Sequence, residues 1–472
     1  MPSSSPVIPA VRPDDAAIAP GRSGAAMAAA LLGTFVMTLD ALIVNVALPS
    51  IGRGLSGGMT SLQWVVDGYT LMFAALLLSA GSVTDTVGAR RAFGAGLGVF
   101  VAASAICGLA PNLQVLIAAR LVQGAGAAVI MPASLALIRQ AYPDSVRRAR
   151  AISIWAMSAS VGASAGPVAG GLLSQVSWRM IFFVNLPVGL AALLLLVRTA
   201  RSPRRSAPFD WIGQIAAVVA MGALTYGAIE AGASGFGEPH VLAAFGLAVL
   251  AVPVFLVAQA RGAHPMVPPA LLRSRTMGVA AAAGFAINVG FYGMIFLLSL
   301  YLQQSRGLSA LTTGLSFVPM TTTAAFISPV SAKLAEKYGR RMPVVTGLLV
   351  MASGLGILSL SPGSTPTWTL VALMIPVGGG GSLALPSVTA MLLDRVPAER
   401  AGTASGVLNA SRQLGGALAI AVFGALVTDT ESFHDGLRNS LLTAALLVLL
   451  AIAAGLLLRP QHNVDAASGR TP

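Results

Sequence analysis

The sequence is poor in charge. Asp, Glu, Lys and Arg make up 10% of its 472 residues, against about 25% in an ordinary soluble domain. Hydrophobic residues make up 56%, and the mean hydropathy is +0.81. So few charges cannot cover the surface of a water-soluble protein of this size. The composition excludes a soluble multidomain protein and indicates a chain that crosses a membrane many times.

Groups that many enzymes use are also scarce. Cys107 is the only cysteine, which excludes disulfide bonds and cysteine metal sites within the chain. The four histidines lie outside the apolar runs and show no HExxH or other metal-ligand spacing. No GxxxxGK(S/T) loop is present that would bind ATP. The sequence predicts no metal, no cofactor and no enzymatic activity.

Fourteen apolar runs approach or exceed the roughly 20 residues that a helix needs to cross the hydrocarbon. Helices are expected because a lipid-exposed backbone must satisfy its own hydrogen bonds. The expected spans are 25–49, 62–82, 92–110, 113–138, 150–172, 181–198, 211–231, 241–260, 277–302, 310–332, 343–361, 367–392, 403–427 and 440–458.

The net charge of +13 is distributed unevenly along this pattern. If the N-terminus is cytoplasmic, the outer loops carry four arginines (Arg53, Arg179, Arg306 and Arg438) and four acids. All other basic residues outside the spans then face the cytoplasm, as the positive-inside rule requires. We therefore expect a multi-pass membrane protein with both termini cytoplasmic. The charge needs no nucleic-acid partner.

Two Arg- and Pro-rich segments, 198–208 and 261–275, set apart a pair of spans in the middle of the chain. The predicted organisation is an N-terminal tail (1–24), a six-helix bundle (25–198), a linker with two inserted helices (199–276), a second six-helix bundle (277–458) and a C-terminal tail (459–472).

The two halves repeat each other. The loop from Gly81 to Arg91, between the second and third spans, has a counterpart from Ala332 to Arg341 between the tenth and eleventh. The fourth span carries Gly124-x-Gly126-x5-Pro132, and the twelfth carries Gly378-x-Gly380-x5-Pro386. Repeated bundles with a substrate site between them, near the midplane, are typical of alternating-access transporters.

Further motifs occur in order on these spans: Leu39-Asp40-Ala41-Leu42-Ile43-Val44-Asn45-Val46-Ala47-Leu48-Pro49, Arg120-x2-Gln123-Gly124-x-Gly126, Gly162-x3-Gly166-Pro167-x2-Gly170-Gly171 and Trp178-Arg179-x2-Phe182-x2-Asn185-x-Pro187-x-Gly189. With the Gly81–Arg91 loop, which departs from the pattern GxLaDrxGrr at Val83, Thr86 and Ala89, they resemble the major facilitator superfamily. The match is to its fourteen-span drug:proton antiporter branch. Trp64-x2-Asp67-Gly68-Tyr69 is similar to actinobacterial antibiotic exporters in particular.

The resemblance implies an all-α major facilitator fold and proton-coupled export of amphipathic small molecules, such as antibiotics or drugs. The expected partners are a small-molecule substrate, protons and the lipid bilayer, with the chain acting as a monomer. The alternative is a symporter that imports a metabolite. A membrane enzyme is disfavoured because no catalytic constellation is present. A channel is disfavoured because the repeated bundles and gating loops indicate alternating access.

Charged residues inside spans are functional candidates, because each costs at least about 2.5–3.5 kcal/mol to insert. At about 1.5 Å per residue, Asp40, Arg120 and Asp67 lie at comparable depths in the outer half of the first bundle. With no histidine in any span, carboxylates are the expected proton carriers. We expect Asp40, Asp67 or both to couple protons, with Arg120 modulating them. The alternative is a permanent salt bridge that only fixes helix packing.

Two other charges fall within or at the end of spans. Arg412 either faces the cavity, where it would neutralise a carboxylate or an anionic substrate, or pairs with backbone carbonyls. Glu230 lies at the outer end of its span, where we expect a solvated charge. The candidate substrate-cavity residues are Phe35, Asn45, Gln123, Trp155, Asn288, Phe291, Tyr292, Arg412 and Gln413, although aromatic side chains on spans more often face lipid or the core.

Two motifs suggest moving parts. Gly88 permits a positive φ in the first loop, where Asp85 can cap a helix and pair with Arg90 or Arg91. In the resembled family this loop latches the halves in the outward-facing state. Glu336, Arg340 and Arg341 form the expected counterpart, and the alternative is a solvated cluster that sets topology. The residues Gly162, Gly166, Pro167, Gly170 and Gly171 predict close helix approach and a bend, for rocking or for static packing.

Overall fold

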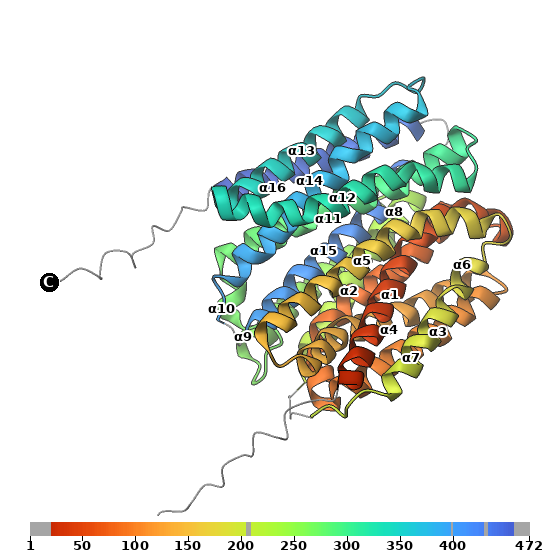
Figure 1. The fold of residues 1–472 in the computed structure, drawn as a ribbon. Coiled ribbons are helices and arrows are strands. Elements are labelled where there is room, and N and C mark those ends of the chain that lie inside the picture. The colour runs from red at the N-terminus through yellow and green to blue at the C-terminus, as the bar shows by residue number, and fades with distance from the viewer. Residues whose placement is uncertain (1–19, 204–208, 398–399, 429–432, 457–472) are drawn as a thin grey trace, which may run out of the picture.

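The computed structural model describes residues 20–203, 209–397, 400–428 and 433–456. Most of the predicted N-terminal tail and all of the predicted C-terminal tail lie outside these ranges. The described residues contain helices and no strand, and the described ends, at Pro20 and Leu456, lie at the same end of the molecule (Figure 1). We call this the terminal end. The opposite end is where α1 ends at Leu55 and α16 begins at Phe433.

The helices of the first bundle follow the expected spans. They are α1 (Pro20–Leu55), α2 (Met59–Val87), α3 (Ala89–Leu109), α4 (Leu113–Ala141), α5 (Ser145–Ser174), α6 (Met180–Phe183) and α7 (Asn185–Val197). The sixth span is the pair α6 and α7, which Val184 separates. Asn112 and Asp144 cap α4 and α5 through side-chain oxygens that accept from backbone N–H groups of the first turn.

The rest of the chain forms the inserted pair and the second bundle. The inserted helices are α8 (Trp211–Ser234) and α9 (Pro239–Arg261). The second bundle follows the short α10 (Pro269–Leu272) and comprises α11 (Arg275–Leu300) with its π-helical extension η2 (Tyr301–Ser305), α12 (Ala310–Tyr338), α13 (Arg341–Ser359), α14 (Thr367–Leu393), α15 (Ala401–Leu426) and α16 (Phe433–Leu456).

Thirteen membrane-spanning candidates occur among the described helices by length and apolarity, with α6 and α7 counted together. The fourteenth expected span is α15, which has 26 residues but is interrupted by polar side chains such as Asn409, Arg412 and Gln413. A charged residue is compatible with a span when it faces the interior of the protein. The expected all-α fold of two six-helix bundles with two additional central helices is confirmed (Figure 1).

The repeated glycines make equivalent contacts in the two bundles. Gly126 packs α4 against the backbone of α3 at Gly96, and Gly380 packs α14 against the backbone of α13 at Gly347. In the same way Gly124 faces α2 and Gly378 faces α12. A side chain at any of these four positions would collide with the neighbouring helix. The repeated motif thus sets the same helix packing twice.

The bundles meet at two junctions, one between α2 and α15 and one between α5 and α12. The inserted helix α8 lies along the first junction. Gln214 of α8 donates to the Ala75 carbonyl of α2 at 2.9 Å, and Trp64 of α2 packs near Tyr226 of α8. Gly232 of α8 contacts Ala425 of α15. Helix α9 packs on α8. The inserted pair therefore covers one junction and leaves the other to the bundles themselves.

The bundles are in tight contact at the opposite end. Ser299 of α11 donates to the Asn45 carbonyl of α1 at 2.7 Å. Gln63 of α2 donates to the Ile420 and Ala421 carbonyls of α15 at 3.0 and 2.7 Å. Toward the terminal end, a hollow of about 270 Å³ separates α2 and α4 from α15. The structure is therefore closed at the opposite end and hollow between the bundles toward the terminal end.

Candidate functional site

A buried ionic cluster surrounds Asp40 of α1. Arg120 of α4 donates through Nη1 to Asp40 Oδ2 at 2.5 Å, and both side chains are fully buried. Asp40 Oδ1 accepts from Gln123 Nε2 at 3.0 Å and from Asn185 Nδ2 at 2.7 Å. Ser104 in turn bonds to Asn185, at 2.9 Å, and so helps to hold it. The carboxylate therefore has three polar partners from two other helices, all within the first bundle.

The guanidinium of Arg120 is held on several sides. It donates through Nε to the Val65 carbonyl at 3.0 Å and through Nη1 to Gln123 Oε1 at 2.8 Å. Its central carbon lies 4.4 Å from the ring centroid of Tyr69, a cation–π contact. Gly124 allows this arrangement, because a Cβ there would meet the Tyr69 backbone of α2. The predicted neighbourhood of Asp40 and Arg120 is thus present as a direct ion pair.

Asp67 has a different environment. It is fully buried on α2, yet neither carboxyl oxygen has a hydrogen-bond partner in the described part of the chain. It lies one helical turn from Gln63, which bonds to α15. Arg120 pairs with Asp40 and does not pair with Asp67. Asp40 and Asp67, which the sequence places at similar depths, therefore occupy separate sites. Asp40 is ion-paired, and Asp67 has no hydrogen-bond partner in the described chain.

This difference predicts unequal effects on stability. Asp40→Asn leaves the buried Arg120 charge without its counter-ion and is expected to cost about 3–5 kcal/mol. Asp67→Asn removes no hydrogen bond and exchanges one unpartnered buried polar group for another of similar shape, so a smaller loss of at most about 1–3 kcal/mol is expected. Denaturation of the two purified variants beside the wild type measures both values. Equal losses would contradict the separation of the sites.

A cavity of about 260 Å³ lies between the bundles. Four of the candidate residues line it from the second bundle: Arg412 of α15 and Asn288, Phe291 and Tyr292 of α11. Side chains of α1 and α5, such as Thr38 and Ser160, line it from the first bundle. Asp40 and Asp67 are not among the lining residues. The substrate-sized space and the buried acids are therefore distinct.

The other predicted cavity residues lie elsewhere. Gln123 belongs to the Asp40 cluster, and Trp155 donates to the Ser134 hydroxyl at 3.1 Å within a small apolar cluster. Asn45 is buried where α1 meets α11. Five of the predicted cavity residues do not line the cavity in this conformation: Phe35, Asn45, Gln123, Trp155 and Gln413.

The first loop packs against its own bundle. Gly88 has φ +92°, the positive value expected, and its backbone touches Ser202. Arg90 donates to the end of α7 and to the segment that follows it: its backbone N–H donates to the Ser202 hydroxyl at 3.0 Å and its guanidinium to the Val197 carbonyl at 2.9 Å. The expected pairing of Asp85 with Arg90 or Arg91 is wrong for this structure, because neither ion pair of the described chain includes Asp85. Asp85 is exposed beside the hollow.

The counterpart loop differs in its partner. Gly339 has φ +80°, matching Gly88. Arg340 forms its ion pair with Asp394 at the end of α14, and not with Glu336. Sequence reasoning missed Asp394, since its position after an apolar run gave no sign of proximity to Arg340. Both members of this pair are more than one-third exposed, so it contributes at most about 1 kcal/mol.

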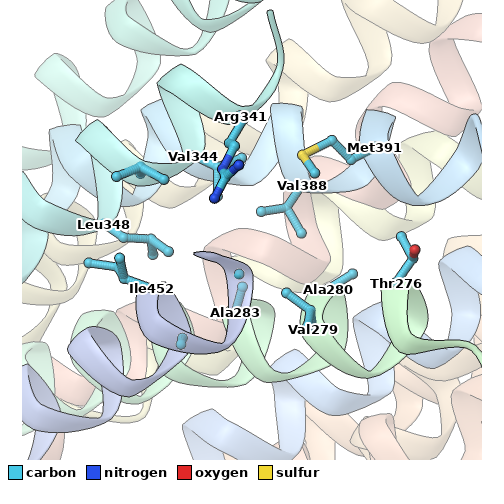
Figure 2. A pocket seen from close by; sticks show the side chains of 13 residues that line it. Thr276, Val279, Ala280, Ala283, Arg341, Val344, Leu348, Val388, Met391 and Ile452 are labelled. Carbon is cyan, nitrogen blue, oxygen red and sulfur yellow. The ribbon is translucent and has the colours of Figure 1, made fainter. Parts of the chain in front are cut away.

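Arg341 lies beside an apolar crevice of the second bundle. Figure 2 shows its guanidinium over side chains that include Val344, Leu348 and Ile452. The crevice measures about 40 Å³, far below the 300–1,000 Å³ or so of a drug-sized site. Arg341 donates to the Leu456 carbonyl at 3.0 Å, which ties α13 to the end of α16.

The glycine motif of α5 lies where three helices meet. Gly162, Gly166 and Gly170 face α1, and a Cβ at any of them would stand within about 3 Å of an α1 atom. Gly171 instead faces α12, where a Cβ would lie 2.5 Å from the Ala310 carbonyl oxygen. Gly314 of α12 makes the reciprocal approach to the Pro167 carbonyl. The motif thus packs α5 within its own bundle and closes the bundles against each other.

Glu230, the remaining candidate, is half-buried near the end of α8 and forms no ion pair in the described chain.

Comparison with protein families gives a match to the Major Facilitator Superfamily over residues 30–420, with a second match over residues 320–470. The chain belongs to this superfamily. The solved structure of a bacterial homologue of the human lysosomal transporter Spinster, inward-facing and occupied, shares the fold with a TM-score of 0.66 at 18% identity. That alignment covers 93% of this chain and 97% of the other.

Relatives in the superfamily include resistance proteins. The chain is 38% identical to the multidrug resistance protein Stp of Mycobacterium tuberculosis over 399 residues, which cover 84% of this chain and 74% of Stp. It is 35% identical to the methylenomycin A resistance protein of Bacillus subtilis over 448 residues, covering 93% of this chain and 94% of the relative.

Proposed function

We propose that the protein exports amphipathic small molecules across a bacterial plasma membrane in exchange for protons, by alternating access. The observation that carries the proposal is the separation of a buried, ion-paired carboxylate in one bundle from a cavity between the two bundles. A proton and a substrate can then bind at different places and act on the same movement of the bundles. The names of the two relatives, which refer to drug and antibiotic resistance, support export over import.

The orientation follows from the charges. Basic residues in excess lie at the terminal end, and the opposite end is balanced. On the positive-inside rule both termini are cytoplasmic. The structure is then the inward-facing conformation, closed toward the outside by the contacts of α1 with α11 and of α5 with α12. Substrate would reach the cavity from the cytoplasmic side, and the chain would work as a monomer.

Asp40 is the proposed proton-coupling acid, and Arg120 modulates it. In this conformation Asp40 is fully buried, so a proton cannot reach it from water without movement. Protonation would weaken the pair with Arg120 by removing the negative charge, and deprotonation would restore it. Asp67 is the second proposed acid. Its exchange with water would require the contact between α2 and α15 to open, because Gln63 closes that contact.

Inside-out membrane vesicles test the proposal directly. The substrate is the compound against which expression of the chain raises resistance most in a drug-susceptibility panel. An acid interior is expected to drive accumulation of that compound, and adding the compound is expected to release protons from the vesicles. A symporter would instead move compound and protons together out of the vesicles. No pH change on addition of the compound would sink the proposal.

A further inference from the structure

The cavity between the bundles has an unusual charge balance. Arg412 is the only charged residue among those that line it, and no Asp or Glu is present. The hydroxyls of Thr38, Ser160 and Thr321 donate to backbone carbonyls of their own helices. The first bundle therefore contributes only small or apolar side chains and satisfied hydroxyls among the described contacts, and charge comes from the second bundle alone.

Arg412 has no counter-ion. It donates through Nη1 to Asn409 Oδ1 at 2.9 Å and through Nε to Asn288 Oδ1 at 3.4 Å. No hydrogen bond of Nη2 occurs in the described chain, and neither ion pair there includes Arg412. Of the two alternatives raised by the sequence, Arg412 faces the cavity and does not bond to backbone carbonyls. Two neutral amides orient the guanidinium without neutralising it.

Asn288 adds a second unused donor beside it. The side chain is 2% exposed, and its Nδ2 has no hydrogen-bond partner among the described residues. The amide orientation follows from Oδ1, which accepts from Arg412. A buried donor without an acceptor costs about 1–3 kcal/mol. A guanidinium and an amide donor thus border one cavity, both with donors unused.

We infer that the cavity binds substrates through a carboxylate group held by Arg412 and Asn288. The inference rests on the proposed export function and names its substrate class. Hydrogen bonds from a guanidinium to an oxyanion are stronger than neutral ones and offer matched geometry. Phe291 and Tyr292, which pack edge to face with ring centroids 5.5 Å apart, supply the apolar wall for the rest of the molecule. An amphipathic cation would meet an uncompensated positive charge.

A matched series of probes tests the class: 1-pyrenebutyrate, its neutral primary amide and 1-pyrenebutylammonium share one ring system and differ in charge. Equilibrium binding to the purified full chain is measured by pyrene fluorescence in lipid nanodiscs, with empty nanodiscs subtracted. The carboxylate is expected to bind at least about tenfold more tightly than the amide, as a charge-assisted contact implies, and the ammonium most weakly. Equal binding of acid and amide, preference for the ammonium, or no saturable binding of any probe would overturn the inference.

Variants locate the effect. Arg412→Gln is expected to abolish the preference for the carboxylate, and Asn288→Asp is expected to do the same by giving Arg412 an internal counter-ion while keeping its side chain. Arg438→Gln, which removes one positive charge from an exposed position at the opposite end, should keep the preference. If Asn288→Asp retains its thermal stability and also keeps the full preference, the assignment to this cavity is wrong.

The binding test is independent of proton coupling. Asp40 does not line the cavity, so an Asp40→Asn protein that remains folded should keep the carboxylate preference even though it no longer exchanges protons. If vesicles show no proton exchange but purified protein selects the anion, the proposed antiport fails and the substrate class stands. If vesicles show proton exchange but the purified protein does not prefer the anion, the proposed antiport stands and only the substrate class is rejected.

Discussion

Removing both charges of the Asp40–Arg120 pair is expected to give a stable protein that no longer transports against a pH gradient. In Asp40→Asn the guanidinium stays buried without a counter-ion, which costs about 3–5 kcal/mol. The double variant Asp40→Asn with Arg120→Gln removes that isolated charge, so it is expected to lose less stability than Asp40→Asn alone. Neither amide can take up or release a proton in the physiological range.

The double variant separates the two roles that the pair could have. If the pair only fixed the packing of α1 against α4, a folded double variant would transport normally. If Asp40 carries the proton, the same variant would show no drug-dependent release of protons from inside-out vesicles. Binding of substrate to the purified variant is the control for an intact cavity. Proton release at the wild-type rate by a folded double variant would refute the coupling role of Asp40.

Gly171→Val is expected to hold the opposite end open. The added side chain would collide with the backbone of α12 at Ala310 and Leu311, which cannot move aside as a flexible side chain could. Overpacking of this kind costs about 1–3 kcal/mol, enough to change a conformational equilibrium about 5- to 150-fold. Because the collision is between bundles, the closed contact should be lost while each bundle stays folded. Transport should fall with it.

Spin labels can follow this shift. Val176 and Gln304 are exposed on the first and second bundles at the opposite end, and replacing Cys107 by Ser leaves the introduced cysteines as the only ones. Gly171→Val should lengthen the distance between the labels. Gly170→Val is the matched control, because its side chain would meet Ile43 of α1 within one bundle. It should lower stability without lengthening the distance. An unchanged distance in Gly171→Val would contradict the assignment.

Much of the fold was predictable because hydropathy and loop charge both report on membrane crossings. Even α15, whose polar residues reduce its apolarity, was counted, because the run 403–427 is long and mostly apolar. The break between α6 and α7 at Val184 was not predicted, although Pro187 gives a local signal for it, since a proline cannot donate to the carbonyl four residues before it. The covering of one junction by α8 also could not be foreseen, because contacts between distant helices leave no periodic pattern.

The sequence predicted the depth of the candidate site residues in the membrane, but not which neighbouring helix each side chain faces. Counting residues placed Asp40, Arg120 and Asp67 at similar levels, yet only the rotation of each helix about its axis decides which side chains meet. That rotation brings Arg120 to Asp40 and leaves Asp67 alone. Asn185 was noticed only as part of a motif, although a buried amide inside a span is itself a sign of a polar cluster. The partner of Arg340, Asp394, lies 54 residues away and had no such sign.

The inserted helices cover only one of the two junctions between the bundles, so the two sides of the molecule that face lipid differ. The junction between α2 and α15 is covered by α8, whereas the junction between α5 and α12 has no inserted helix over it. Exposed apolar side chains flank that second junction, among them Met157 and Val161 of α5 and Phe326 of α12. A compound that entered the cavity from the lipid leaflet would therefore have to pass between α5 and α12, because α8 covers the other junction. Capture from the membrane would be one-sided, whatever route serves compounds dissolved in the cytoplasm.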